Sequence, residues 1–193
     1  RPIGYFVVAP FANATLRCMK YGQWLDIIKA LSVRRPVVVV GNSSLRLPDM
    51  DMSAGEFSQA VAQIGGGVFN AVDSTTIRVL MALISRSFCL VGLDSAPLYM
   101  AQAVGTPAIS IWGTHAPAAR IGYDKNYMDL AIWRTDSCQF SPCFAYGKFP
   151  ESKCPNGIRQ TCCEVLGSVT VDDVLKKVDM VETANAQLGK FEA

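Results

Sequence analysis

The chain has 193 residues, 50% of them hydrophobic, and carries 18 Lys and Arg against 16 Asp and Glu. This composition excludes a disordered or low-complexity protein. The formal charge of +2 is too small for a protein that binds nucleic acid through its phosphates, so we expect no nucleic-acid partner. No apolar run reaches the ~18 residues that a membrane-spanning helix needs, so we expect no transmembrane segment.

Short β-rich runs alternate with helix-length stretches over the first 135 residues. Apolar residues at helical spacing predict helices over 21–31 and 76–84, and a shorter helix begins near Ser95. This alternation is typical of β-α-β units, so we expect an α/β fold in which a Rossmann-like parallel sheet is flanked by helices. The run Val37–Val40 is apolar throughout, which indicates a strand covered on both faces. The expected strands are residues 3–9, 36–41, 67–70, 88–92, 108–112 and 128–133.

We interpret residues 1–193 as one domain with two distinctive parts near its end. Residues 136–168 are rich in Cys, Pro and Gly and predict an irregular lobe, whereas 169–190 predict a terminal helix capped by Thr170. Residues 43–53 are the expected mobile loop. The expected cap of the 76–84 helix is one of Asp73, Ser74 and Thr75.

The most informative motif places Asp94 and Ser95 where an expected strand gives way to a helix. The free backbone N–H groups of a first helical turn form an anion site, and ligands of parallel sheets bind at the carboxyl ends of strands. The loop 113–115 follows another expected strand and would open onto the same edge. A capping role alone for Asp94 and Ser95 is the simpler alternative.

The same motif carries a family resemblance. It resembles the carboxyl-terminal, donor-binding half of the ADP-heptose:lipopolysaccharide heptosyltransferases, glycosyltransferase family 9, which implies half of a GT-B fold. The resemblance extends to other parts of the chain. Similar to the corresponding parts of the family are the first strand with Pro10, the basic Arg17, the helix with Trp24, strand 37–41, the Cys-rich tail and the helix start at 168–174. The motif itself reads Asp94-Ser95-Ala96-Pro97-Leu98-Tyr99-Met100-Ala101, then Gly105-Thr106-Pro107, an apolar strand and Trp112-Gly113-Thr114.

The resemblance implies a role for each matching residue. Arg17 would neutralise phosphate charge, and Asp94 would anchor donor hydroxyls or the turn. Backbone or hydroxyl donors for the diphosphate would come from Ser95, Ala96 and Leu98, with Tyr99 beside them. The opposite wall of the cleft would consist of Gly113, Thr114 and His115. Ala96 and Tyr99 depart from the usual Gly and His of the family, and the acidic residue often found after the second strand is not evident at 41–45.

The implied function is transfer of a heptose-like sugar from a nucleotide diphosphate sugar, such as ADP-heptose, to a glycan or protein acceptor, with inversion. The family's catalytic base lies in an amino-terminal domain that is missing here, so we expect no catalytic residue in this chain and no activity from the isolated domain. The resemblance also implies lipopolysaccharide biosynthesis and a cytoplasmic protein, peripheral at the inner membrane. The alternative is a non-catalytic nucleotide or sugar-nucleotide binding module, in which Ala96 and Tyr99 mark lost activity.

Five cysteines gather in the irregular lobe, and they supply enough thiols for a four-sulfur metal site. Their spacing differs from that of a paired zinc ribbon, so a structural Zn or Fe, disulfides in an exported protein, and free thiols all remain open. Some members of the resembling family carry iron on four such cysteines. A metal-dependent interaction module is a third functional reading. The candidate ligands are Cys138, Cys143, Cys154, Cys162 and Cys163.

Overall fold

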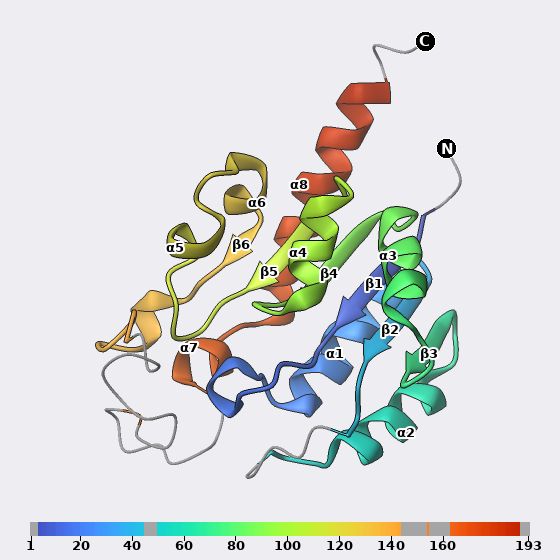
Figure 1. Ribbon diagram of the computed structural model, residues 1–193, viewed down its shortest axis with the longest axis horizontal. Helices are drawn as coiled ribbons and strands as arrows, with labels where there is room; N and C mark the ends of the chain where they lie inside the picture. The colour runs from blue at the N-terminus through green and yellow to red at the C-terminus, as the bar shows by residue number, and fades with distance from the viewer. Residues whose placement is uncertain (1–3, 45–49, 144–153, 155–162, 190–193) are drawn as a thin grey trace.

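The computed structural model describes residues 4–44, 50–143, 154 and 163–189 (Figure 1). The described strands form one parallel sheet in the order β3-β2-β1-β4-β5-β6. The expected α/β fold with a parallel sheet is therefore confirmed. The strands are β1 (Phe6–Ala9), β2 (Val37–Gly41), β3 (Val68–Val72), β4 (Cys89–Leu93), β5 (Ala108–Ile111) and β6 (Ala131–Ile132).

Helices cover both faces of the sheet (Figure 1). One face packs against α1 (Tyr21–Ser32), α2 (Ala54–Ile64), α7 (Glu164–Gly167) and α8 (Val171–Gly189). The other packs against α3 (Ile77–Ser85), α4 (Ala96–Ala103), α5 (Ala118–Ile121) and α6 (Lys125–Asp129). Two short 3-10 turns complete the described elements, η1 (Thr15–Arg17) and η2 (Thr135–Ser137).

The core explains the apolar run in β2. Val37 and Val39 are buried with Trp24 of α1 and Phe57 of α2, whereas Val40 is buried on the opposite face beside Ile84 of α3. Burial of both faces removes the alternation that a half-solvated strand shows. The prediction that this strand is covered on both faces is confirmed.

Local capping chemistry sets where the helices begin. Thr170 Oγ1 accepts from the Asp173 amide at 3.2 Å, as expected for the cap of α8. Helix α3 instead begins after Thr76, whose Oγ1 accepts from the Val79 amide at 3.3 Å, so the expected cap at 73–75 is wrong. Helix α2, absent from our expectation, begins at a capping box in which Ser53 and Glu56 bond each other's backbone.

The expected strand at 128–133 is mostly wrong. Asp124 caps a helix by accepting from the Asn126 amide at 3.0 Å, and that helix runs to Asp129. The hydroxyl of Tyr127 bonds two buried carbonyls, those of Ala101 and Thr106, and so ties the helix to α4 and to the loop that precedes β5. Strand pairing is left to Ala131 and Ile132, opposite Ser110 and Ile111 of β5.

Parts of three predictions lie outside the described residues: residues 45–49 of the expected loop, most of the Cys-rich lobe including Cys162, and the start of the first expected strand. Strand β1 begins at Phe6. Among the helices that the structure describes, none combines the length and apolarity that a membrane crossing requires.

Candidate donor-binding site

The carboxyl ends of β1, β4 and β5 bring three loops to one edge of the sheet (Figure 1). The loop after β1 carries η1 and Arg17, the turn after β4 carries Asp94 and Ser95, and the loop after β5 runs through Thr114 and His115. Because β1 and β5 are the two neighbours of β4, residues far apart in the sequence meet here. The edge is the one where parallel sheets bind their ligands.

A small cavity of about 10 Å³ lies among these loops. A small-molecule site occupies roughly 300–1,000 Å³, so this cavity is too small to hold a nucleotide sugar by itself. The structure brings part of the predicted donor-binding set together around this cavity. Its lining residues are Arg17, Asp94, Ile111, Trp112, Gly113, Thr114 and His115.

Helix α4 begins directly beside this cavity. Ser95 is its N-cap in extended conformation, and within the described residues the buried Ser95 Oγ has no hydrogen-bond partner. Pro97 has no amide hydrogen, and the amide of Leu98 donates to the Ser95 carbonyl at 3.0 Å. The exposed Ala96 is therefore the first-turn residue whose amide faces outward, whereas the Leu98 side chain belongs to the core.

Asp94 begins the turn after β4 and is almost fully buried, with 6% of its surface exposed. Its Oδ1 accepts from the hydroxyl of Tyr99, one turn along α4, at 2.7 Å. Its backbone carbonyl accepts from Arg17 Nη1 at 3.3 Å, which links the turn to the loop after β1.

Arg17 lies at the end of η1 and faces Asp94 from the neighbouring strand's loop. Its Nη2 donates to Asn13 Oδ1, and its Nη1 to the Asp94 carbonyl. The guanidinium is thus fixed from two sides at the edge where the α4 N-terminus lies. A fixed cation beside a helix N-terminus forms an environment suited to an anion.

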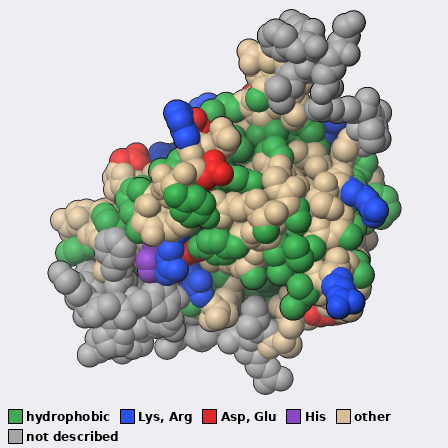
Figure 2. All heavy atoms as spheres, turned by 45° about the horizontal axis from the view of Figure 1, so that its top comes forward, with side chains coloured by type: hydrophobic (Ala, Val, Ile, Leu, Met, Phe, Trp, Pro, Cys, Tyr) green, Lys and Arg blue, Asp and Glu red, His purple; other side chains and the backbone are tan. Residues whose placement is uncertain are grey.

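His115 is mostly buried, and its Nδ1 lies 3.0 Å from the Thr114 hydroxyl. Burial lowers the pKa of His115 below its ordinary value, and the positive charge of Arg120 lowers it further, while Asp94 acts in the opposite direction. Figure 2 shows the histidine, in purple, beside blue basic side chains. Nearby positive charge of this kind favours the neutral ring. His115 is therefore neutral near pH 7.

Two residues near the site were missed from the sequence. Asn13 holds Arg17, and Arg120 of α5 acts on His115. Neither position carries a local signal, because Asn13 lies in a loop and Arg120 reaches the site only through the packing of α5. Two tryptophans support the loop after β5: Trp112 is fully buried, and Trp133 Nε1 donates to the Gly113 carbonyl at 3.1 Å.

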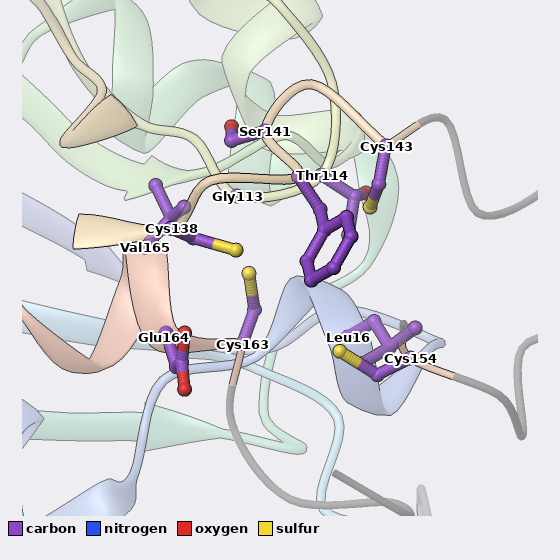
Figure 3. A pocket seen from close by; sticks show the side chains of 11 residues that line it. Leu16, Gly113, Thr114, Cys138, Ser141, Cys143, Cys154, Cys163, Glu164 and Val165 are labelled. Carbon is purple, nitrogen blue, oxygen red and sulfur yellow. The ribbon is translucent and has the colours of Figure 1, made fainter. Parts of the chain in front are cut away.

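A second small cavity, about 20 Å³ in volume, lies between η1, the loop after β5 and the described cysteines near the end of the chain (Figure 3). Cys138, Cys143, Cys154 and Cys163 all line it, and in Figure 3 the sulfurs of Cys138 and Cys163 point toward each other. Thiols in this number suit a thiophilic metal ion. Over the ranges that the structure describes, however, no group of three or more Cys, His, Asp or Glu residues is placed to hold a metal.

The two cavities share a wall. Gly113 and Thr114 line both of them, and Leu16 of η1, next to Arg17, lines the second. The described cysteines therefore line a cavity against the same loop that forms the candidate donor site.

A family model, Glycosyltransferase family 9 (heptosyltransferase), matches residues 21–149, more than half of the chain. The chain belongs to glycosyltransferase family 9. The resemblance read from the Asp94 motif is thereby confirmed.

Similar proteins point to the same family. The chain is 32% identical over 114 residues to lipopolysaccharide heptosyltransferase 3 of Escherichia coli, a match that covers 56% of this chain and 31% of that protein. Its fold is similar to E. coli ADP-heptose lipopolysaccharide heptosyltransferase II, with a TM-score of 0.65 and 15% identity, over 96% of this chain and 49% of the other. It is also similar to the dodecameric iron-containing heptosyltransferase TibC in complex with ADP-D-β-D-heptose, with a TM-score of 0.64 and 14% identity, over 94% and 45% of the two chains.

These matches span less than half of the relatives' own lengths. The fold of the chain is therefore that of part of a GT-B heptosyltransferase.

Two residues depart from the family 9 motif at this site, Ala96 and Tyr99, and the structure gives each a distinct setting. Ala96 is exposed at the helix start, and Tyr99 is bonded to Asp94.

Proposed function

We propose that this chain is the donor-binding domain, spanning residues 1–193, of a heptosyltransferase-type glycosyltransferase that takes a nucleotide diphosphate sugar of the ADP-heptose kind. The observation that carries the proposal is the buried, unpartnered Ser95 Oγ at the N-terminus of α4, with Arg17 fixed across from it by Asp94. A diphosphate supplies an acceptor oxygen for this hydroxyl, and its negative charge suits both the N-terminus of α4 and the guanidinium beside it.

The chemistry of sugar transfer explains why such a site helps the reaction. Breaking the bond between the sugar and the diphosphate leaves negative charge on the departing phosphate oxygen. A helix N-terminus and a fixed cation stabilise that charge more strongly as it develops, which lowers the barrier. We place Arg17 and the first turn of α4 against the leaving diphosphate, and Asp94 against hydroxyl groups of the donor.

The remaining residues of the proposed site have supporting roles. Gly113, Thr114 and His115 form the wall that faces α4. An amino-terminal domain would bind the acceptor, a glycan or a protein, and would supply the base that activates it. The sugar would then be transferred, with inversion, between the two domains. This proposal places the protein in the cytoplasm, peripheral at the inner membrane, in lipopolysaccharide biosynthesis. Because the matching relatives are named as transferases, we retain this function over a non-catalytic binding module.

A thermal-shift panel of ADP, GDP, UDP and their sugar conjugates tests the proposal. A ligand at 100 times its dissociation constant stabilises the folded state by about 2.7 kcal/mol. We expect a shift with ADP-heptose and ADP that exceeds the shift with the GDP and UDP compounds. Ser95→Ala should lose most of this shift, whereas Ser85→Ala, on the outer surface of α3, should keep it. Absence of any shift would rule out a donor site in this chain.

A second proposal concerns the cysteine lobe. We propose that Cys138, Cys143, Cys154 and one of Cys162 and Cys163 hold a structural Zn or Fe ion. Support comes from the shared cavity that four of these cysteines line, and from the iron named for TibC. Such an ion would cross-link cysteines that lie up to 25 residues apart in the sequence, from Cys138 to Cys163.

Elemental analysis of the purified protein tests the metal directly. We expect about one metal ion per chain, and a lower thermal transition after strong chelation because metal binding adds to folding free energy. Cys143→Ser should lower the metal content, whereas Cys89→Ser, in the buried strand β4, serves as the control for loss of a thiol elsewhere. A protein without metal, with an unchanged transition after chelation, refutes the proposal in favour of disulfides or free thiols.

A further inference from the structure

Tyr99 touches the candidate donor site through one specific bond. Its hydroxyl donates to Asp94 Oδ1 at 2.7 Å, across the first turn of α4. Over the described part of the chain, no other side chain donates to this carboxylate. A carboxylate with only 6% of its surface exposed needs such a donor, because an unsatisfied buried charge is strongly unfavourable.

The bond engages only one of the two oxygens of the Asp94 carboxylate. With Oδ1 occupied by Tyr99, the second carboxylate oxygen is left to accept from a hydroxyl group of a ligand. The backbone of Asp94 is held at the same time by Arg17, so the residue is restrained at both its carbonyl and its carboxylate. Removal of the Tyr99 hydroxyl would free the carboxylate to rotate or to take up water.

Tyr99 suits this role at every physiological pH. Burial, followed by the hydrogen bond and the negative charge of Asp94, raises the pKa of Tyr99 to about 12, although Arg120 opposes the shift. Tyr123, which lies between α5 and α6, also raises the pKa of Tyr99. The hydroxyl therefore remains a donor throughout, whereas an imidazole at this position would titrate near pH 6.5.

We propose that Tyr99 is a positioning residue of the donor site: it holds the Asp94 carboxylate in the orientation that accepts a hydroxyl group of the nucleotide sugar. Tyr99 acts through Asp94 and makes no contact of its own with the donor. This inference rests on the proposed function, and it changes the role of Tyr99 from a ligand contact to a support for one.

Titration calorimetry with ADP-heptose on a double-mutant cycle tests the inference. We expect Tyr99→Phe to weaken binding five- to twentyfold, and Asp94→Asn to weaken it by at least as much. The double variant should bind no more weakly than Asp94→Asn alone, because the hydroxyl has nothing left to position. Tyr123→Phe removes the same atom from an exposed ring, 77% accessible, and should bind like the wild type.

Each outcome has a distinct meaning. If Tyr99→Phe binds like the wild type, or if the losses of the two single variants multiply in the double variant, Tyr99 does not act through Asp94 and the inference is overturned. If the wild type itself fails to bind ADP-heptose, the proposed function is refuted first. NMR titration of labelled tyrosine adds a readout without ligand: Asp94→Asn should lower the pKa of Tyr99, and an unchanged titration would contradict the bond.

Discussion

Gly113 and Leu166 lie so close that a Cβ added to Gly113 would stand 2.9 Å from Leu166 Cδ1. The same Cβ would lie 3.2 Å from the backbone carbonyl oxygen of Leu16 in η1. Gly113 is thus the point where the loop after β5, the short helix α7 and the loop after β1 press together. It is also a residue shared by both cavities, so its packing links the four described cysteines of the second cavity to the candidate donor site.

Gly113→Ala should therefore destabilise the protein. Overpacking at a close-packed position costs about 1–3 kcal/mol, because the backbone at Leu16 cannot move away as a flexible side chain would. Urea unfolding at pH 7 measures the change. The matched control is Gly55→Ala, in α2, where a Cβ meets nothing closer than 4.0 Å and alanine favours the helix. Equal stability of Gly113→Ala and the wild type would contradict the close packing.

Acid should weaken the start of α8. Burial alone raises the pKa of Asp173, but hydrogen bonds from Thr170 and the charge of Arg134 outweigh it and lower the pKa below the ordinary 3.8. A carboxyl with a lowered pKa adds stability above its unfolded-state pKa, and that stability disappears as pH falls through the folded-state value. The free energy of unfolding of Asp173→Asn should accordingly be lower than that of the wild type at pH 7, and this deficit should shrink below about pH 4.

Urea unfolding across this pH range measures the deficit, with Asp172→Asn as the control. Asp172 is the exposed neighbour in the same helical turn, and the described structure records no hydrogen bond to its side chain. A deficit of Asp173→Asn that stays constant down to pH 3 would show that its carboxylate charge contributes nothing.

Donor binding should strengthen in mild acid. His115 is neutral at pH 7 because burial and Arg120 lower its pKa. A bound diphosphate favours the protonated ring, so affinity rises as pH falls below 6.5, by roughly fivefold for about 1 kcal/mol of added attraction. Calorimetry with ADP-heptose at pH 7.5 and 5.5 measures the rise, and His115→Asn should abolish it. Persistence of the full rise in His115→Asn would place the titrating group elsewhere.

The sequence predicts most of the fold because its strongest signals are local. Val37–Val40 is apolar throughout, and Thr170 precedes an acidic first turn, so strand β2 and helix α8 follow from short segments. Helix α2 was missed although Ser53 and Glu56 have the spacing of a capping box, since its many small residues resemble a loop. Residues 128 and 129 belong to α6 and not to the expected strand, because the burial of Tyr127 against α4, which holds this helix in place, depends on tertiary packing.

The candidate site was predictable to the extent that topology brings it together. Arg17 and Asp94 are 77 residues apart, yet β1 and β4 are neighbours, and their carboxyl ends must meet. The bond between Tyr99 and Asp94 was beyond the sequence, because it depends on the rotamers of two side chains around a helix start. For the same reason Asn13 gave no sign of its contact with Arg17.

A crystal structure of this chain with bound ADP tests the central claim most directly. The account predicts that the diphosphate lies at the N-terminus of α4, with phosphate oxygens ~2.7–3.1 Å from Ser95 Oγ and the Ala96 amide and with Arg17 facing them. ADP seated elsewhere, for example in the groove between α6 and α8, with Ser95 Oγ still unpartnered, would contradict it.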